Sequence, residues 1–495
     1  MKKIIVVGAG VSGLAAAVRL QKLGYDVTLY EKEGQPVGKM NQIKENGFTF
    51  DVGPTIVMMP EIYREVFEFA GVDPNDYIPM EKVDPMLQLY FAQDEPLTFS
   101  NDLVELTKTL EAISEEDAQG YFAFLADIYK RYVIAKESFI TKSFRTWRDF
   151  YNPKSLWAGL KLRTFSDAYS SISKFVKDDR LRKSLAFQTL YIGVSPYQGP
   201  SLYTIIPMIE LMYGVYFIKG GMYTLATGMA RLFQELGGTI HYNTPIDELL
   251  IENKQTKGVR VNGETITADA VICAADFPYA MESLIPDESK RGKYTNQKIA
   301  SMDYSCSCFL LYLGLDKKYE DSALHSIYFA NDFKRNVDDL FEAGKLPEDP
   351  SFYLYRPTLK DASLAPDGQE GLYVLVPVPE LSKFDQWTDE TIQSYRQQII
   401  GLLKEKTIFT DIDEHIVYEK MYTPDTFNDR FNAYNSATFG LKPTLAQSNY
   451  YRPHNKFDYA EGLYFCGSST HPGAGVPIVM QSAKLAVEEL LKDDR

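Results

Sequence analysis

The stretch Ile4-Ile5-Val6-Val7-Gly8-Ala9-Gly10-Val11-Ser12-Gly13 decides the fold of this chain. Its first four residues are a β-branched run, which is typical of a buried parallel strand. The glycines that follow have the spacing G-x-G-x-x-G. Gly8 permits a tight turn, Gly10 leaves room for a pyrophosphate against the backbone, and Gly13 lets the next helix pack closely on the strand. The stretch therefore predicts a dinucleotide-binding unit.

The residues after this stretch complete a strand, helix, strand unit. Residues 14–23 are expected to form a helix whose N-terminus points free N–H groups at the pyrophosphate, and Gly24 is placed to end it. Residues 26–30 are expected to form the second strand, with Glu31 at its carboxyl end. A carboxylate there accepts hydrogen bonds from ribose hydroxyls and repels a 2′-phosphate. The expected cofactor is therefore FAD or NAD and not NADP.

Length and composition restrict the class of protein. A chain of 495 residues is expected to form two or three domains. Apolar residues make up 45% and charged residues 24%, the proportions of a globular protein. The net charge of −15, without a basic repeat or a zinc-type spacing, argues against nucleic acid as a partner and gives no metal site.

The cysteines and the apolar runs bear on where the protein works. None of the four cysteines has a C-x-x-C partner for metal or redox chemistry, which fits a reducing cytoplasmic compartment. Cys306 and Cys308 would lie on one face of a strand, where two buried thiols are favoured over a strained disulfide. The N-terminal apolar run reaches Arg19 before the ~20 residues that a bilayer span needs. A bundle of membrane-spanning helices is therefore not expected.

The chain is expected to return to the nucleotide unit twice. Gly220-Gly221 precedes a predicted helix at about 223–236, strands at 239–243 and 246–251, an Asn262-Gly263 hairpin, and a buried strand at 270–275 that is followed by Asp276. Residues 463–466 are a predicted strand, 467–476 a loop of small residues, and 478–491 a helix. This second helix N-terminus could set N–H groups against the pyrimidine edge of a flavin.

Three side chains and one turn are further candidates. Lys39 could reach a phosphate oxygen, and a solvated lysine is the alternative. The turn Gly53-Pro54-Thr55 could bring backbone against a ring system. Glu210 is the single acid of the apolar stretch 202–218; it is either a proton acceptor with a raised pKa or, more commonly, a satisfied structural carboxylate. His471 is interpreted as a hydrogen bonder that braces its loop rather than as a general base.

A basic and aromatic segment extends from Lys142 to Lys183. It holds eleven Lys and Arg against four Asp, a net charge of +7 in an acidic chain. Basic residues attract anionic lipid, and aromatic rings bury at the headgroup boundary. The segment is therefore predicted to dock on a membrane around the mouth of a substrate tunnel; the alternative is a solvated basic face whose aromatic residues belong to the core. Its large apolar residues are Phe144, Trp147, Phe150, Leu156, Trp157, Leu160, Phe165 and Phe175.

Several stretches together identify a family. They are the glycine fingerprint with Glu31, Phe48-x-Phe50-Asp51-x-Gly53-Pro54-Thr55, Phe217 to Met222 and above all Gly467 to Pro477. Nearly end to end the chain resembles the bacterial carotenoid (phytoene) desaturase branch of the flavin amine oxidase superfamily. Three stretches, 199–203, 443–453 and 469–477, are similar to desaturases of thirty-carbon isoprenoids. One departure is Val37-Gly38-Lys39, where many relatives have Gly-Gly-Arg, because lysine keeps the charge but loses the bidentate fork.

The resemblance implies a fold class, a cofactor and a reaction. The fold class is α/β, with a discontinuous Rossmann-like FAD-binding domain (1–83, 220–276 and 444–495) and an inserted mixed α+β substrate domain (84–219 and 277–443) that includes a helical membrane-associating region. Non-covalent FAD would take a hydride from an allylic carbon of a long-chain isoprenoid, step after step, and a quinone or oxygen would take the electrons. The residues expected to bind the cofactor are Gly8, Gly10, Ser12, Gly13, Glu31, Lys39, Met40, Pro54, Thr55, Ile246, Asp276, Gly467, Gly475 and Val476.

Other functions remain open at this point. An amine oxidase or an enzyme that oxidises a terminal methyl group of the same pigments would have the same fold, and fold alone does not separate these activities. A non-catalytic lipid carrier is a third alternative, against which the complete glycine set and Glu31 argue. No His, Cys or Ser constellation for covalent catalysis stands out, so the catalytic residue is unknown and the chemistry is expected to be the cofactor's. The expected location is the cytoplasm, peripherally on the cytoplasmic membrane.

Overall fold

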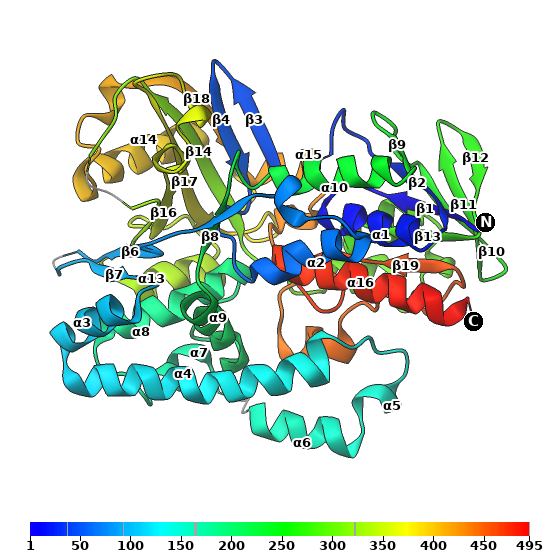
Figure 1. Ribbon diagram of the computed structural model, residues 1–495, viewed down its shortest axis with the longest axis horizontal. Coiled ribbons are helices and arrows are strands. Elements are labelled where there is room, and N and C mark those ends of the chain that lie inside the picture. Colours follow the sequence, from blue (N-terminus) through cyan, green and yellow to red (C-terminus); the bar gives the residue numbers. More distant parts are fainter. Residues whose placement is uncertain (37, 93, 163–165, 321–322, 495) are drawn as a thin grey trace.

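The N-terminal unit folds as the glycine spacing predicts. Figure 1 presents the computed structural model of the protein, which describes residues 1–36, 38–92, 94–162, 166–320 and 323–494. Strand β1 (Lys3–Val7) leads into the glycine turn, α1 (Val11–Lys22) follows, and β2 (Asp26–Tyr30) pairs with β1 in parallel. The helix begins three residues earlier than predicted because Gly10 already serves as its N-cap.

Five strands from distant parts of the chain form a parallel sheet. Their order is β19 (Leu463–Phe465), β13 (Ala270–Cys273), β1, β2 and β9 (Thr239–His241), and all four neighbouring pairs are parallel. The two predicted returns of the chain to the nucleotide unit are therefore confirmed.

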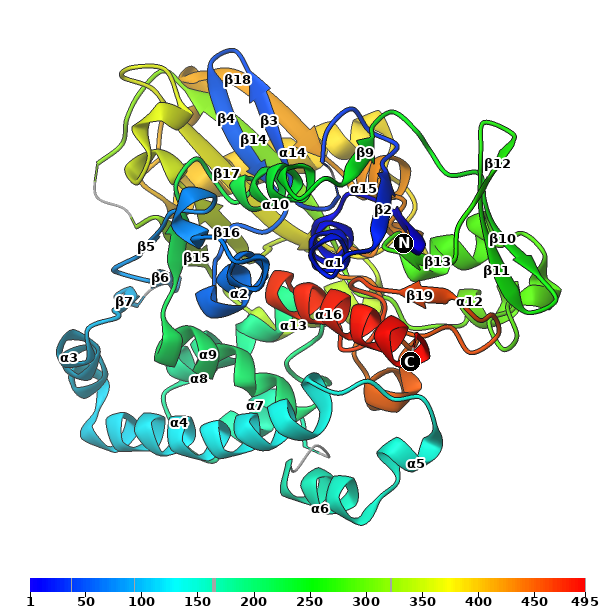
Figure 2. The same cartoon turned by 45° about the vertical axis from the view of Figure 1, so that its right-hand side comes forward.

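Successive residues of the central strand face two different layers. Ile4 and Val6 pack against a layer of helices, whereas Ile5 and Val7 pack against a small antiparallel sheet, and both layers lie over the parallel sheet in Figure 2. A strand buried on both faces must be apolar at every position, which explains the continuous β-branched run. The helices are α1, α2 (Pro60–Ala70), α10 (Thr224–Glu235) and α16 (Val476–Asp493), and the small sheet contains β10 (Glu248–Glu252), β11 (Gln255–Val261) and β12 (Glu264–Thr267).

A mixed seven-stranded sheet forms the other half of the molecule. β14 is buried along its whole length because α14 (Asp389–Lys406) covers one face of the sheet and a second apolar cluster covers the other. All four cysteines are buried and free, which confirms the prediction made for Cys306 and Cys308, and Cys308 lies within β14. The strand order is β18 (Ile416–Tyr422), β14 (Ser307–Leu315), β17 (Glu370–Val378), β16 (Phe352–Tyr355), β15 (His325–Tyr328), β6 (Leu87–Tyr90) and β7 (Leu97–Phe99).

A layer of helices lies below this sheet. The long helix α4 runs along the lower edge of Figure 1, and α5 and α6 lie outside it. None of the helices formed by the described residues has both the length and the hydropathy needed to cross a membrane. The layer contains α3 (Leu103–Ile113), α4 (Glu115–Ala135), α5 (Trp147–Phe150), α6 (Pro153–Leu162), α7 (Ala168–Ile172), α8 (Asp179–Ala186) and α9 (Ile205–Tyr213).

Short elements connect these layers. Two-stranded sheets are formed by β3 (Asn41–Glu45) with β4 (Phe48–Val52) and by β5 (Met80–Lys82) with β8 (Tyr216–Ile218). The remaining α-helices among the described residues are α11 (Phe277–Tyr279), α12 (Asn296–Ala300), α13 (Phe333–Asp338) and α15 (Pro424–Phe431). The strands of the large sheet come from both predicted inserted segments, and the exact domain boundaries stay a prediction.

Candidate cofactor and substrate site

One large cavity collects most of the predicted site residues. Its volume is about 1310 Å³, above the roughly 300–1,000 Å³ of a typical single-ligand site, so it has room for a cofactor and a substrate together. Of the fifteen predicted site residues, only Gly13 and Glu210 are absent from its lining. The lining contains Gly8, Gly10, Ser12, Glu31, Lys39, Met40, Pro54, Thr55, Ile246, Asp276, Gly467, Gly475 and Val476.

Two helix N-termini face one end of this cavity, which we call the glycine end and define by residues 8–12, Glu31 and residues 467–476. Helices α1 and α16 begin there after Gly10 and Gly475, and they pack against each other. Neither start has a side-chain cap or an acid in its first turn among the described residues, whereas Asp102 and Ser114 cap α3 and α4. Uncapped N–H groups and two positive dipole ends make this end a site for an anion.

The glycines of the first loop are required by space as well as by conformation. Gly8 has a φ of +95°, which L side chains rarely adopt. A Cβ on Gly13 would lie 2.0 Å from the carbonyl oxygen of Gly8, and Ala274 is also close. Gly13 therefore holds the helix against the turn from behind, as the spacing predicts, and is not part of the cavity wall.

Glu31 is buried at the glycine end and supports the turn itself. Its carboxylate accepts hydrogen bonds from the N–H groups of Ala9, at 2.7 Å, and Glu33, at 3.0 Å. Burial raises the pKa of Glu31, and these two N–H groups oppose the rise. Because a carboxylate offers about four lone-pair sites, the bond to Ala9 leaves room for the predicted ribose hydroxyls.

Lys39 and Asp276 lie on the same wall. The Lys39 ammonium donates to the carbonyl of Ala437 at 3.0 Å; burial lowers its pKa, and the charge of Asp276 opposes that shift. Asp276 accepts hydrogen bonds from the Ser469 hydroxyl at 2.7 Å and the Tyr434 N–H at 3.3 Å. The predicted phosphate contact of Lys39 stays a prediction, because its ammonium is already bound to the protein.

Two of the motifs that identified the family meet inside the structure. Asp51 accepts hydrogen bonds from the N–H groups of Met222 and Tyr223, at the start of α10. Burial raises the pKa of Asp51 to about 6. A Cβ on Gly221 would lie 2.6 Å from the Asp51 carboxylate. These residues therefore join β4 to α10, which is a structural role.

A buried arginine that the sequence did not single out shapes the second glycine loop. The Arg452 guanidinium donates to the carbonyls of Ser468 and Thr470 in that loop and of Leu441 and Gln447 outside it. Burial lowers its pKa to about 10. Nothing in the run Tyr-Tyr-Arg-Pro distinguishes this side chain from a solvated arginine, so only the structure identifies it.

The second glycine loop is also attached to the helical layer. Nε2 of the buried His471 donates to the carbonyls of Phe139, at 3.1 Å, and Lys142, at 2.8 Å. Burial lowers the pKa of His471 to about 4, so the ring is neutral near pH 7. The interpretation of His471 as a hydrogen bonder that braces its loop is confirmed.

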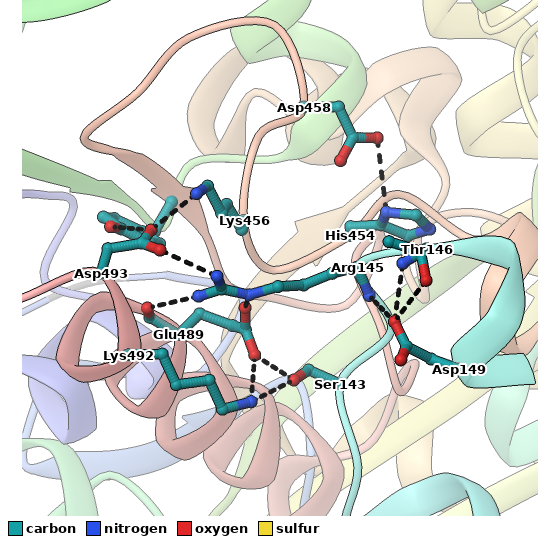
Figure 3. Close-up of polar contacts among 11 residues, drawn as sticks. Ser143, Arg145, Thr146, Asp149, His454, Lys456, Asp458, Glu489, Lys492 and Asp493 are labelled. Carbon is teal, nitrogen blue, oxygen red and sulfur yellow. Dashed lines mark hydrogen bonds and ion pairs between the residues drawn. The ribbon is translucent and has the colours of Figure 1, made fainter. Parts of the chain in front are cut away.

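A network of charges fastens the start of the basic segment to α16, as Figure 3 shows. The Glu489 side chain of α16 is 1% exposed; it forms ion pairs with Arg145 and Lys492 and accepts a hydrogen bond from the Ser143 hydroxyl. Arg145 also forms an ion pair with Asp493, at 2.8 Å. Because α16 begins at the glycine end, residues 143–149 and the second glycine loop are held by one helix.

The other end of the cavity, which we call the apolar end, lies between the large sheet and the helical layer. The charged residues in the described lining are Glu31, Lys32, Lys39, Asp276 and Arg430, and Arg430 lies within electrostatic reach of Lys32. The described lining of the apolar end therefore contains no charged side chain. It includes Phe150, Leu156, Leu190, Ile209, Ile327 and Phe439.

Glu210 is buried behind this wall. Its carboxyl accepts a hydrogen bond from the Gln188 amide at 2.8 Å, and burial raises its pKa to about 8. The raised pKa is as predicted. However, Glu210 does not line the cavity and is mostly protonated at neutral pH, so the structure does not favour it as a proton acceptor.

The cavity opens between α5–α6 and residues 445–451, a rim that we call the mouth. Tyr151, Leu156, Leu445 and Tyr451 line the cavity and are nevertheless 43 to 55% exposed. Trp147 and Trp157 beside them are 56 and 57% exposed, with Arg148 and Lys161 over their rings. Apolar side chains of this size in water at an opening mark a contact with lipid or with another protein.

The structure corrects part of the prediction that residues 142–183 dock on a membrane. Phe144 is buried and Phe175 packs against the core, so neither is free to meet lipid. Lys177, Arg180 and Lys183 pair with Glu116, Asp178 and Asp179. The predicted membrane contact therefore stays a prediction for α5–α6, and the ion pairs and buried rings of the rest of the segment do not favour it there. The Leu160 side chain, Arg163 and Phe165 lie outside the described residues.

Comparison with known proteins places this geometry in context. Residues 11–491 match the family of flavin containing amine oxidoreductases. The 4,4'-diapophytoene desaturase (4,4'-diaponeurosporene-forming) of Staphylococcus haemolyticus is 47% identical over 495 residues, and that of Staphylococcus aureus strain Newman is 47% identical over 497 residues; each alignment covers 99% of both chains.

Solved structures show the same fold at low identity. An oxidoreductase from Methanosarcina mazei has a TM-score of 0.66 at 16% identity, covering 99% of this chain and 100% of its own. Cyclohexylamine oxidase from Brevibacterium oxydans has a TM-score of 0.60 at 14% identity, covering 99% of each chain. The overall fold is therefore shared with oxidoreductases whose sequences differ widely from this one.

Proposed function

This chain belongs to the flavin containing amine oxidoreductase family, and within it we propose an FAD-dependent desaturase that converts 4,4'-diapophytoene (dehydrosqualene) stepwise into the yellow carotenoid 4,4'-diaponeurosporene. One observation carries the proposal: a single cavity joins an anion-binding glycine end to an apolar end whose described lining has no charged side chain. A cofactor with a pyrophosphate suits the first end, and a hydrocarbon suits the second. The relatives at 47% identity supply the name of the hydrocarbon.

The glycine end fits FAD in its donors and in its shape. Gly10 and Ser12 at the start of α1 would hold the pyrophosphate, Glu31 the ribose, and Gly475 and Val476 at the start of α16 the pyrimidine edge. FAD bound here would act as the acceptor for a hydride from an allylic carbon of the substrate. The positive dipole end of α16 would stabilise the negative charge that this transfer brings to the ring.

The apolar end would position the polyene and keep water away from it. A protonated amine placed there would lose its hydration without gaining a counter-charge, which is costly. This argues against an amine substrate. The oxidation of a terminal methyl group would need the same apolar wall. The shape of the cavity therefore does not distinguish a methyl oxidase from a desaturase, and the reaction product has to.

The test is a pair of incubations that differ only in the substrate. Purified protein with FAD is supplied with liposomes that carry either 4,4'-diapophytoene or 4,4'-diaponeurosporene, and the pigments are read by absorbance and mass. New conjugated double bonds from the first substrate support the proposal. A terminal aldehyde from the second substrate, without desaturation of the first, would identify a methyl oxidase, and binding without turnover would identify a carrier.

We propose a quinone or oxygen as the electron acceptor. The same incubation under argon, with and without a soluble quinone, distinguishes the two, because only a quinone-dependent enzyme keeps desaturating without oxygen. A quinone is itself apolar and would reach the cavity through the mouth.

We further propose that α5 and α6 dock on the cytoplasmic surface of the membrane. The rim of exposed apolar side chains at the mouth supports this, together with the basic residues Arg148, Lys154 and Lys161 on the same two helices. A long hydrocarbon is insoluble in water, so an opening that touches lipid would let it enter without crossing the solvent.

A further inference from the structure

Three polar side chains form a hydrogen-bonded row in the wall of the apolar end. The Thr55 hydroxyl lies 2.7 Å from the Tyr353 hydroxyl, which lies 2.7 Å from Nδ1 of His325. Thr55 and Tyr353 line the cavity, while His325 lies behind them on β15 and is 1% exposed. Neither Tyr353 nor His325 stands out in the sequence, because alternate aromatic residues in a strand are ordinary core residues.

The row lies where the two ends of the cavity meet. Thr55 directly follows the Gly53-Pro54 turn that is predicted to lie against the ring of the cofactor. The Tyr373 hydroxyl donates to the carbonyl of Gly53 at 2.9 Å, which ties this turn to the large sheet. The Tyr353 hydroxyl is therefore placed next to both the expected ring and the expected hydrocarbon.

His325, Tyr353 and Glu210 are uncharged near neutral pH, whereas Asp51, which also acts on Tyr353 through its charge, has a pKa of about 6 and is mostly ionised there. Burial lowers the pKa of His325 to about 3 and raises that of Tyr353, so an imidazole with a free lone pair faces a phenol. Burial raises the pKa of Glu210, which lies within electrostatic reach of Tyr353, to about 8. If Thr55 donates to Tyr353 and Tyr353 donates to His325, the Nδ1 lone pair is the acceptor at the end of the row and the imidazole carries its proton on Nε2.

We propose that Tyr353 and His325 accept the proton that the substrate loses in each desaturation, an inference that rests on the proposed function. Loss of a hydride to bound FAD would leave a cationic carbon. This transfer would be reversible until the adjacent C–H bond breaks, so net reduction of the flavin depends on proton loss. The electron pair of that C–H bond becomes the new double bond, and the proton goes to the Tyr353 oxygen while the Tyr353 hydroxyl proton moves to Nδ1 of His325. The substrate loses two hydrogens and two electrons in total; bound FAD would supply the acceptor for the hydride and, finally, for the proton that His325 and Tyr353 release.

A weak base is sufficient for this step and also suits repeated turnover. A proton beside a cationic carbon is far more acidic than imidazolium, so even a base with a lowered pKa accepts it. Because burial disfavours the imidazolium, His325 then gives the proton back through Tyr353 and is ready for the next step. Asp276 also lines the cavity, but its two oxygens accept from Ser469 and Tyr434 at the glycine end.

The test measures single-turnover reduction of the bound flavin without oxygen, with ordinary 4,4'-diapophytoene and with substrate deuterated at the carbons that lose the proton. Tyr353→Phe is expected to slow the reduction by about 10² or more, the contribution of a general base. His325→Gln should slow it in the same direction. In both variants the isotope effect should rise, because proton loss becomes the slow step, while FAD content, flavin midpoint potential and thermal stability stay at the wild-type values.

The matched control is Tyr312→Phe, which removes a buried phenol from β14 outside the cavity lining and should leave the rate unchanged. If the wild-type protein does not desaturate 4,4'-diapophytoene, the proposed function fails. If it does, and Tyr353→Phe reduces its flavin at the wild-type rate with the same isotope effect, the proton inference alone is wrong.

A second measurement gives the tautomer of His325 directly. Nitrogen-15 NMR of histidine-labelled protein should show two buried rings, His325 and His471, that carry their proton on Nε2 and do not titrate between about pH 5 and pH 8. His471 is fixed in that tautomer by its carbonyl acceptors. His454 is also buried, so the His325 signal is assigned as the one that disappears in His325→Gln. A proton on Nδ1 of His325 would mean that it is a donor to Tyr353, and the inference would be overturned.

Discussion

The two ends of the cavity are built by different parts of the polypeptide. At the glycine end the backbone does the binding, through two uncapped helix starts and a turn with a left-handed Gly8. At the apolar end side chains from several strands and helices share the contact, and no single one dominates. Single substitutions should therefore abolish function at the first end and be tolerated at the second, unless they alter charge or interrupt the row formed by Thr55, Tyr353 and His325.

The largest effect is expected from the first loop. Gly10→Val should abolish FAD binding because its side chain would occupy the path of the pyrophosphate. Gly13→Ala should do the same and also destabilise the protein, since its Cβ would lie 2.0 Å from the Gly8 carbonyl oxygen. Flavin absorbance of the purified variants measures both outcomes.

The matched change at the apolar end is Gly159→Ala in α6, where a Cβ would meet nothing within 4 Å. This variant should keep its FAD and its activity. Full flavin content in Gly10→Val, or loss of flavin in Gly159→Ala, would remove the distinction between the two ends.

A second effect concerns charge behind the apolar end. Glu210 has a pKa of about 8 in the folded protein against 4.5 in the unfolded chain. Its contribution to stability is therefore complete below about pH 4.5 and is lost as the pH rises to about 8, because only the unfolded chain ionises in this window. Since one pKa unit corresponds to about 1.4 kcal/mol, the loss is several kcal/mol.

Glu210→Gln cannot ionise and should escape this loss. Urea unfolding of both proteins at several pH values measures the difference in the free energy of unfolding, which should move in favour of the variant as the pH rises from about 4.5 to about 8. Two curves that run parallel across this window would contradict the raised pKa.

A smaller effect is expected from Glu31→Gln at the glycine end. The change removes a charge-assisted hydrogen bond to the cofactor and weakens the bond from the Ala9 N–H, which should weaken FAD binding by roughly 1–3 kcal/mol. The dissociation constant of FAD from apoprotein measures this. An unchanged constant would mean that the ribose is held by other groups.

The same division explains what the sequence could predict. Glycines and one acid at fixed spacing define the backbone path, so Gly8, Gly13 and Glu31 were assigned from the sequence and take the expected places in the turn. The strands 270–275 and 463–466 were placed because buried parallel strands have a recognisable composition. These patterns involve residues close together in the chain, so they can be recognised in a single sequence.

The apolar end has no such signal. Tyr353 and His325 become partners only because β15 and β16 pair, and Arg452 gains its role only because two loops meet around it. Long-range pairing of this kind is not encoded in spacing.

The basic segment is predicted as one membrane contact, but Phe144 is buried, Phe175 packs against the core and Lys177 pairs with Glu116 of α4. Charge counting does not distinguish this part from α5–α6.

The smallest effect is expected at the mouth. Lys154→Gln and Lys161→Gln remove two positive charges from α6, which should weaken binding to anionic liposomes by about 1 kcal/mol for each lysine at low salt. Lys161 lies 3.5 Å from the centre of the Trp157 ring, so its loss should also loosen that ring. Cosedimentation with vesicles of stated anionic lipid content measures the binding, and activity in detergent should survive, because neither lysine lines the cavity.

The matched control is Lys44→Gln with Lys257→Gln, two exposed lysines on β3 and β11, away from α6 in Figure 1. Because attraction between exposed charges is screened by salt, the wild-type advantage should shrink as the salt concentration rises. Equal weakening in the control pair, or binding that salt does not affect, would show that α6 does not make the membrane contact, and the mouth would then have to receive its hydrocarbon from a carrier protein.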